Sequence, residues 1–357
     1  MMANTQLLYS SIDDYLGPGE ERFFGRGYRR AEYQVGEIVT RSVDDADPGI
    51  RATVTVGYPQ DWSRKATDVD LRPHLSTVDM LVLGVQFSEM HLTHAYGLDE
   101  VMRRTAWLRR VTLRAGSKPQ EDLVALPGSA ILRETKAVPG ASNSFVSVYD
   151  CRVGEMQARC EIEHQISERA IGEGSYTSME DLLGPAAHRY YGEGFKFGRQ
   201  HIEDVRIDMT ALRSSASVQI DATEECHAAT AGIEGKYQPS LSMIDCFVTN
   251  LQLAQVLMYE MDSVERHNSN TLWMLRTVLD ATQPHRPCTA PLEAHASISK
   301  KHLLPLRGGT WRNVDIIGHC GGVNLRSSFA HELPTNTVRD TRRSADEPGN
   351  DDGSQTR

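Results

Sequence analysis

The sequence predicts an α+β fold in which one module occurs twice, each copy being a curled antiparallel sheet wrapped around one long helix. Three observations predict this fold. An 18-residue motif recurs in the second half of the chain, a long apolar helix candidate follows each copy, and alternating strand patterns surround each helix candidate. At 357 residues the chain is long enough for two such domains.

The repeated motif is the clearest feature of the sequence. It spans Ser11–Tyr28 (SIDDYLGPGEERFFGRGY) and returns at Ser178–Phe195 (SMEDLLGPAAHRYYGEGF), an offset of 167 with eight identical positions. Downstream, Pro73–Gln86 matches Pro239–Gln252 at an offset of 166. Solenoid repeats have periods of about 20 to 50 residues, so this spacing indicates two fused domains that pack as a pseudodimer within one chain.

The repeat divides the chain into three predicted parts. We place the first repeat, a curled sheet around one helix (a hot-dog-like module), at residues 1–170 and the second at residues 171–333. The remaining tail, residues 334–357, is polar and charged and has no apolar anchors, so we expect it to be disordered.

The composition excludes several classes of partner. A net charge of −10 argues against nucleic acid, because binding to phosphates needs a surplus of Lys and Arg. No apolar run reaches about 18 residues and the first residues lack a signal-peptide pattern, so we expect no membrane partner and a cytoplasmic location. The six cysteines have neither zinc-site nor redox spacing, and we expect no metal.

The first predicted elements are a short helix and two strands in each copy. Ser11 and Asp14 have the spacing of a capping box, and the Leu-Gly-Pro that follows ends the helix. Alternating apolar residues then predict strands at Glu32–Val39 and Arg51–Tyr58, and in the second copy at Ile202–Met209 and Ser215–Asp221.

One long buried helix comes next in each copy. Leu75–Leu92 carries apolar residues around most of its circumference, and Leu241–Met261 has the same character, which is typical of a buried helix. Further strands are predicted at Thr105–Ala115, Ser129–Lys136, Ser144–Arg152 and Gln157–Gln165, then, after a linker at Ile171–Thr177, at Trp273–Asp280, Leu292–Ile298, Trp311–Ile317 and Val323–Ala330. A single helix wrapped by an antiparallel sheet is the hot-dog layout, so the prediction is a double hot-dog fold with internal duplication.

Polar residues on these apolar helices are the candidate catalytic residues. Asp79 and Gln86 lie seven positions apart and share one helix face, and Asp245 and Gln252 repeat the pair. A buried carboxylate needs partners, so each aspartate either acts in catalysis or caps a helix N-terminus. His74 favours the first copy as the active one, because the second copy has serine at the matching position. The predicted catalytic set is Asp79, His74 and Gln86.

Two duplicated arginines are candidate substrate-binding residues, together with Asp245 and Gln252 of the second copy. Arg22 and Arg189 each precede an aromatic pair, and a guanidinium in that setting can clamp a phosphate or carboxylate. The alternative is a salt bridge to the duplicated acids or stacking on the neighbouring rings. The Gly-x-Gly turns that follow lack the third glycine of a dinucleotide-binding fingerprint.

The motif together with HLSTVDMLVLGVQF resembles the bacterial avirulence protein D (AvrD) family over roughly residues 10–334. The resemblance implies a cytoplasmic biosynthetic enzyme that makes syringolide-type acyl-glycoside elicitors from a β-ketoacyl precursor and a pentulose. The implied reaction is esterification of a sugar hydroxyl by a β-ketoacyl thioester, followed by an aldol-type ring closure, similar to the work of butenolide synthases. The resemblance carries over no named catalytic residue.

The expected activity is therefore acyl transfer and condensation by a double hot-dog enzyme. The expected partners are a β-ketoacyl thioester, held on acyl carrier protein or coenzyme A, and a sugar-like acceptor, with no other cofactor. An apolar tunnel between the two long helices is expected to hold the acyl chain, with His74 or Asp79 as general base. Two alternatives stay open: a thioesterase or hydratase/dehydratase on the same scaffold, and a non-catalytic protein that binds acyl ligands.

Overall fold

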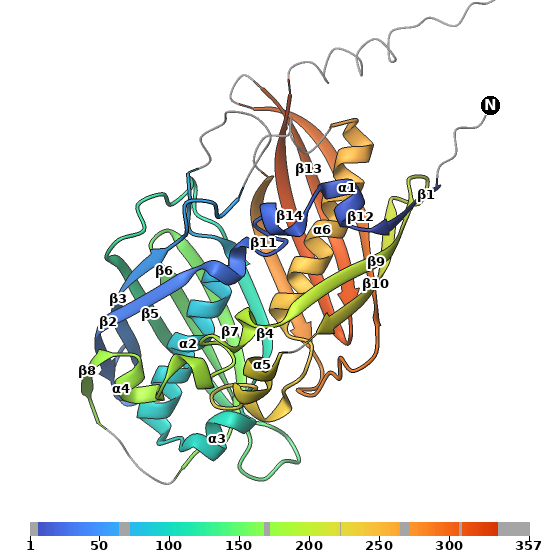
Figure 1. Ribbon diagram of the computed structural model, residues 1–357. Helices are drawn as coiled ribbons and strands as arrows, with labels where there is room; N and C mark the ends of the chain where they lie inside the picture. The colour runs from blue at the N-terminus through green and yellow to red at the C-terminus, as the bar shows by residue number, and fades with distance from the viewer. Residues whose placement is uncertain are drawn as a thin grey trace, which may run out of the picture.

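The described part of the chain forms one antiparallel sheet of 14 strands that packs around two long helices (Figure 1). The structure, a computed structural model, describes residues 6–63, 72–167, 172–221, 223–264, 272–306 and 309–334. The strand order is β1-β9-β10-β12-β13-β14-β11-β4-β7-β6-β5-β3-β2-β8. The predicted disorder of the tail concerns residues that, apart from Pro334, lie outside the described ones.

The N-terminal half, residues 6–167, holds seven described strands and the first long helix. Its elements are β1 (Gln6–Ser11), α1 (Asp13–Leu16), the 3₁₀ turns η1 (Gly19–Glu21) and η2 (Gly27–Arg30), β2 (Glu32–Arg41), β3 (Gly49–Gly57), α2 (Thr77–Tyr96), α3 (Glu100–Thr105), β4 (Trp107–Arg114), β5 (Leu126–Ala137), β6 (Phe145–Val153) and β7 (Met156–His164).

The C-terminal half, residues 172–334, has nearly the same order of elements. They are β8 (Gly174–Ser178), α4 (Glu180–Leu183), the 3₁₀ turns η3 (Ala186–His188) and η4 (Gly194–Lys196), β9 (Arg199–Asp208), β10 (Arg213–Asp221), α5 (Glu224–Ala228), η5 (Gly235–Tyr237), α6 (Met243–Asp262), β11 (Leu272–Ala281), β12 (Leu292–Leu306), β13 (Gly309–Cys320) and β14 (Val323–Leu333).

The predicted strands and both long helices are confirmed, with most ends shifted by a few residues, whereas β1, α3 and α5 were not predicted. Three further differences have a visible cause. The segment predicted as a linker contains strand β8, because its backbone pairs with β2. Thr105 ends helix α3 and does not begin a strand, since Asp99 caps that helix through a hydrogen bond from the Met102 amide of 2.8 Å. Strand β12 continues to Leu306, well past the predicted end at Ile298, along its partner β13.

The two halves join edge to edge through β4 and β11. These strands pair antiparallel from Arg276 opposite Arg114 to Asp280 opposite Arg110, so the sheet runs without interruption from one half to the other. The pairing joins the edge strand of one hot-dog-like sheet to the edge strand of the other. Figure 1 shows α2 and α6 lying on the same side of the continuous sheet.

Each half lends its first strand to the other half. Strand β1 pairs with β9 of the C-terminal half, and β8 pairs with β2 of the N-terminal half, as Figure 1 shows at the two ends of the sheet. A hydrogen bond of 2.9 Å from the Ile12 amide to the Ile202 carbonyl extends the first exchange. The exchange places the segment after β1 against α6, and this brings residues of both halves into one site.

Helices α2 and α6 begin in the same way. Ser76 accepts a hydrogen bond from the Asp79 amide at 3.1 Å, and the Asp79 carboxylate accepts one from the Ser76 amide at 2.6 Å. Ser242 and Asp245 form the same capping box, with distances of 3.2 and 3.1 Å. Such a box satisfies amides that have no partner within the helix, so the predicted helix starts have a clear physical cause.

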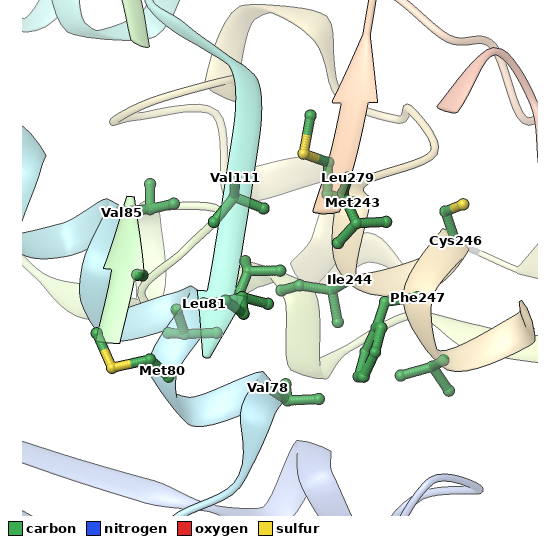
Figure 2. Packing of buried hydrophobic residues seen from close by; sticks show 14 of the residues in the cluster. Val78, Met80, Leu81, Val85, Val111, Met243, Ile244, Cys246, Phe247 and Leu279 are labelled. Carbon is green, nitrogen blue, oxygen red and sulfur yellow. The ribbon is translucent and has the colours of Figure 1, made fainter. Parts of the chain in front are cut away.

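The core is continuous across the halves. Figure 2 shows Leu81 of α2 and Ile244 of α6 beside Val111 of β4 and Leu279 of β11, and all four side chains are buried. At about 25 cal/mol for each Å² of apolar surface removed from water, this shared cluster stabilises the contact between halves. Among the described residues, no helix is both long and apolar enough to cross a membrane.

Candidate functional site

A cavity of about 190 Å³ lies between the two halves and is lined by residues of both. The N-terminal half contributes the loop around Phe23 and Phe24, the start of α2 and the loop that follows β4. The C-terminal half contributes one face of α6 and the start of β11. The strand exchange produces this arrangement, because it lays the loop after β1 against α6.

The wall on the α6 side is mainly apolar. Phe247, Leu251, Gln255 and Tyr259 line the cavity at intervals of four residues, which places them along one side of the helix. The ring of Phe24 meets that of Phe247 edge to face, with centroids 6.2 Å apart. This wall can take up an unbranched apolar chain, and Gln255 is its one amide.

The opposite end of the cavity is polar. His74, Ser76, Thr77, Lys118 and Gln120 line it. His74 is half-buried, and its Nδ1 lies 3.4 Å from the Arg72 carbonyl oxygen, a contact in which Nδ1–H donates. That tautomer leaves the lone pair on Nε2, the form in which an imidazole accepts a proton.

The imidazole of His74 is held by an aromatic neighbour. Its ring packs edge to face on Trp62, with centroids 6.0 Å apart, and Trp62 also contacts Phe23 and Tyr58. Beside it, the first turn of α2 presents the positive end of the helix dipole to the cavity, since Thr77 is the first helical residue. A base and a site for developing negative charge therefore stand side by side.

Asp79 lies behind this first turn and does not line the cavity. The side chain is fully buried, and besides the Ser76 amide its carboxylate accepts hydrogen bonds from the hydroxyl of Tyr33, at 2.8 Å, and from that of Tyr58. Burial raises the pKa of the Asp79 carboxyl, while the hydrogen bonds from Tyr58, Ser76 and Tyr33 act in the opposite direction. The geometry fits the capping alternative, in which Asp79 positions the start of α2.

Gln86 is not brought to His74 either. It lies two turns further along α2 and is buried at 3% exposure, outside the lining of the cavity. The predicted catalytic set of Asp79, His74 and Gln86 is thus divided by the structure: His74 reaches the cavity, and the other two lie within the protein behind its wall.

The structure brings together two predicted binding residues from different halves. Arg22 donates a hydrogen bond of 2.5 Å from Nη1 to Oε1 of Gln252, and its Nη2 forms an ion pair with Asp13. Arg22 is 4% exposed and lines the cavity. The hydrogen bond between Arg22 and Gln252 connects the exchanged loop to α6 and holds Arg22 at the wall of the cavity.

Replacing Arg22 with methionine is expected to lower the free energy of unfolding by about 1–3 kcal/mol, because Oε1 of Gln252 then stays buried without its donor. Urea unfolding at neutral pH measures the change. Arg26→Met is the matched control, since Arg26 pairs with Glu20 at an accessible position (35% and 65% exposed side chains) and such pairs contribute less than about 1 kcal/mol. Equal losses of stability from the two substitutions would contradict a stabilising role of the hydrogen bond between Arg22 and Gln252.

Arg189 occupies the position that matches Arg22 but has different partners. It is buried and donates from Nε to the Gly184 carbonyl at 3.2 Å. Burial lowers its guanidinium pKa and the charge of Glu89 raises it, so the two groups lie close enough to interact. Glu89 is itself buried on α2. The structure places Arg189 in the interior and away from the cavity.

Asp245 caps α6 and also ties the halves together. Its carboxylate accepts from the Ser242 hydroxyl at 2.7 Å and lies 3.4 Å from Nη2 of Arg29 in the N-terminal half. It does not line the cavity. Of the four predicted binding residues, Arg22 alone lines the cavity, Gln252 binds Arg22, and Arg189 and Asp245 lie elsewhere.

The corresponding place in the other half is much smaller: a hollow of about 20 Å³ lies at Ser240. At the offset of 166, Gln120 and His74 correspond to Arg286 and Ser240. Arg286 is 2% exposed, donates 2.7 Å from Nε to the Leu241 carbonyl, and pairs at 3.3 Å with the buried Glu234. Sequence reasoning missed this ion pair, although the change from Gln120 to Arg286 was visible. The asymmetry predicted from His74 and Ser240 extends to the space beside them.

The described residues hold no cluster of three or more His, Cys, Asp or Glu side chains able to bind a metal ion. Of the cysteines whose side chains are described, all five are buried and unpaired. The polar groups that line the cavity are an imidazole, hydroxyls, amides, a lysine, a guanidinium and an indole.

Comparison with solved structures finds similar folds at low sequence identity. A tesB protein of Mycobacterium avium subs paratuberculosis has 7% identity and a TM-score of 0.38, covering 80% of this chain and 93% of that chain. A protein of unknown function with hot dog fold from Alicyclobacillus acidocaldarius has 10% identity and a TM-score of 0.33, covering 81% and 94%. The dehydratase domain of the polyketide PpsC from Mycobacterium tuberculosis has 10% identity and a TM-score of 0.34, covering 84% and 97%. At these TM-scores the likeness supports no inference about activity.

Comparison of the sequence itself is more specific. None of the curated proteins compared matches it. The family model described as Pseudomonas avirulence D protein (AvrD) matches residues 7–334, which is nearly the whole chain and includes both copies of the repeated motif. The expected resemblance is confirmed, and the chain belongs to the AvrD family.

Proposed function

We propose that the protein is an enzyme that joins a β-ketoacyl thioester to a sugar-like acceptor, giving a syringolide-like acyl glycoside. The observation that carries the proposal is the division of the cavity: an apolar wall from α6 and a polar end with His74 beside the start of α2. The apolar wall suits the acyl chain and the polar end suits the thioester and the hydroxyl that attacks it.

In the proposed first step His74 is the general base. Nε2 takes the proton of the acceptor hydroxyl while the hydroxyl oxygen bonds to the thioester carbon, and the carbonyl oxygen becomes negative. The first turn of α2, at Ser76 and Thr77, faces the cavity with its helix dipole positive, which favours that charge. When the C–S bond breaks, the imidazolium returns the proton to the sulfur, and the ester is left.

The second proposed step closes a ring. A proton leaves the carbon between the two carbonyl groups of the β-ketoacyl unit, and that carbon bonds to the keto carbon of the esterified sugar, whose oxygen takes up a proton. The same imidazole is neutral again after the first step and serves as the base. Asp79 and Gln86 have supporting roles in this proposal, with Asp79 fixing the helix start that borders the reaction centre.

The matching order of elements in the two halves supports descent from one duplicated module, the division at residues 170 and 171 being its boundary. We further propose that only the cavity at His74 is active, because the equivalent hollow at Ser240 measures only about 20 Å³ and the Arg286–Glu234 ion pair lies buried beside it. Under this proposal the C-terminal half shapes the acyl site and contributes no base.

Thioester hydrolysis is the second candidate function. His74 is half-exposed, so water can reach the same base and replace the sugar hydroxyl as the attacking group. Hydrolysis and acyl transfer then differ only in what occupies the acceptor site.

Incubation of the purified protein with a β-ketoacyl thioester, with and without a pentulose, tests the proposal by mass spectrometry. We expect an acyl-pentulose product that forms only with the acceptor, and release of free acid that is slower by at least about tenfold. Free acid formed at the same rate with and without pentulose would identify a hydrolase. Tight binding of the thioester with no turnover would identify a non-catalytic binding protein.

A further inference from the structure

The outer face of the sheet carries a concentration of arginines on the N-terminal half and on the adjoining strand β11. Arg114, Arg133, Arg152, Arg159 and Arg276 line a shallow hollow of about 510 Å³, in which Asp150 is the one acidic residue. All five arginines are exposed. We call these five residues the arginine face. It stands out on a chain whose net charge is −10.

The strand register arranges this face as a row. Ser129, Arg152, Gln157, Arg114 and Arg276 are successive partners across β5, β6, β7, β4 and β11. With neighbouring strands about 4.8 Å apart, the row extends for about 19 Å. Donors spread over this length match an extended acidic surface, whereas a single phosphate needs donors that converge on one point.

The arrangement costs stability in the free protein. Arg114 and Arg276 are direct cross-strand partners, and like charges placed opposite each other are destabilising. The Asp150 carboxylate forms ion pairs with Arg133 and Arg159, each at 2.7 Å, and neither arginine belongs to the row. The row itself contains no carboxylate. A negatively charged partner removes this repulsion on binding.

The other half provides an internal comparison. The corresponding row there contains His295, His319, Asn324 and Asp280, and it ends at Arg110 of β4. Asn324 joins its neighbours, with hydrogen bonds of 3.0 Å to His319 and 3.2 Å to Asp280. Where the arginine face pairs two arginines, this row pairs Arg110 with an aspartate. The positive row thus lies on the half that has His74 and on the adjoining strand β11.

The arginine face also borders the cavity. Arg114 ends β4, and the next residue, Ala115, lines the cavity. Gln157 belongs to the row, and the preceding residue, Met156, lines the cavity. The two sites therefore meet at the same ends of β4 and β7.

We propose that the arginine face docks the acidic surface of a carrier protein that delivers the acyl chain to the cavity on a flexible thioester-bearing arm. This inference rests on the proposed function, since it names the form in which the donor arrives. Positive charges at the rim of an interface act mainly on the rate of encounter, and their effect falls as salt screens them.

The test compares three donors with the same β-ketoacyl chain: bacterial acyl carrier protein, coenzyme A and a short uncharged pantetheine thioester. The variant is Arg114→Glu with Arg276→Glu. We expect kcat/KM for the carrier-bound donor to fall at least about tenfold at low salt, and kcat/KM for the other two donors to stay within about twofold. The matched control is Arg206→Glu with Arg213→Glu, which changes the net charge equally at exposed positions of β9 and β10 and should alter none of the three.

Each outcome is informative. Equal kcat/KM of variant and control with the carrier-bound donor overturns the docking proposal, and a loss restricted to coenzyme A identifies a nucleotide-phosphate site in its place. If the wild type turns over none of the three donors, the proposed function fails. Binding of carrier protein without an acyl chain, measured by titration calorimetry, then decides on docking alone: loss in the arginine variant supports it, and absence of binding to the wild type overturns it.

Discussion

Replacing His74 with asparagine is expected to lower kcat for acyl transfer by about 10²–10⁴, the usual contribution of a general base. The fold should be unaffected, because the side chain is half-buried and its polar contact within the described residues is the 3.4 Å approach to the Arg72 carbonyl. Asparagine keeps a donor for that carbonyl but has no group that takes a proton near neutral pH.

Initial rates with a saturating β-ketoacyl thioester and pentulose measure this effect, together with the melting temperature. His302→Asn is the control, since His302 is exposed on β12 and outside the cavity lining. The assignment of His74 as base fails if His74→Asn turns over at the wild-type rate with an unchanged melting temperature. Asp79→Asn, measured beside it, separates the two interpretations of that residue: a positioning role predicts a smaller loss of kcat than His74→Asn gives.

Acidification from pH 6.5 to about 4 is expected to remove several kcal/mol of stability through two buried histidines. Burial lowers the pKa of His91 to about 4 and that of His164 to about 4, from an ordinary value of 6.5. Both rings already have partners as neutral groups: His91 contacts the Tyr149 hydroxyl at 2.8 Å, and His164 the Ser147 hydroxyl at 2.7 Å. In the unfolded chain these histidines take up protons near pH 6.5, whereas in the folded protein they do so only near pH 4. Acid therefore stabilises the unfolded state before it stabilises the folded state.

The sign follows from the lowered pKa values. The contribution of each histidine is fully present above pH 6.5, declines as the pH falls through the window, and is lost below about 4, an amount of about 3 kcal/mol each. Urea unfolding at half-unit pH steps measures the slope. In the double variant His91→Gln with His164→Gln, the free energy of unfolding should decline less steeply with falling pH. NMR titration of the wild type measures the two imidazole pKa values directly, and we expect both near 4. Ordinary values near 6.5 would overturn the prediction.

Much of the fold was predictable because local patterns specify it. The apolar character of Leu75–Leu92 indicated a buried helix, and the structure has one at Thr77–Tyr96. Capping by Asp79 was one of two alternatives in the sequence. The exchange of β1 and β8 was not predictable, since pairing between Gln6–Ser11 and β9 depends on contacts almost 200 residues apart in sequence. The segment that contains β8 was interpreted as a linker because a five-residue edge strand carries little pattern of its own.

The site was predictable only in part. The change from His74 to Ser240 at matching positions pointed to a residue that lines the polar end of the cavity. The α6 wall was not identified, because Phe247 and its neighbours look like any buried helix face until the exchanged loop is known to lie beside them. Asp79 carried two interpretations in the sequence, and the tyrosine hydroxyls that surround it are visible only in three dimensions.

The central claim is that the cavity between the halves holds an acyl chain with its thioester beside His74. The most direct test is an experimental structure of the protein with a β-ketoacyl pantetheine analogue in which a methylene group replaces the thioester sulfur. The account predicts the chain along Phe247 and Leu251, with the carbonyl carbon within about 4 Å of Nε2 of His74. A chain bound in any other place, or a carbonyl that faces away from His74, would contradict it.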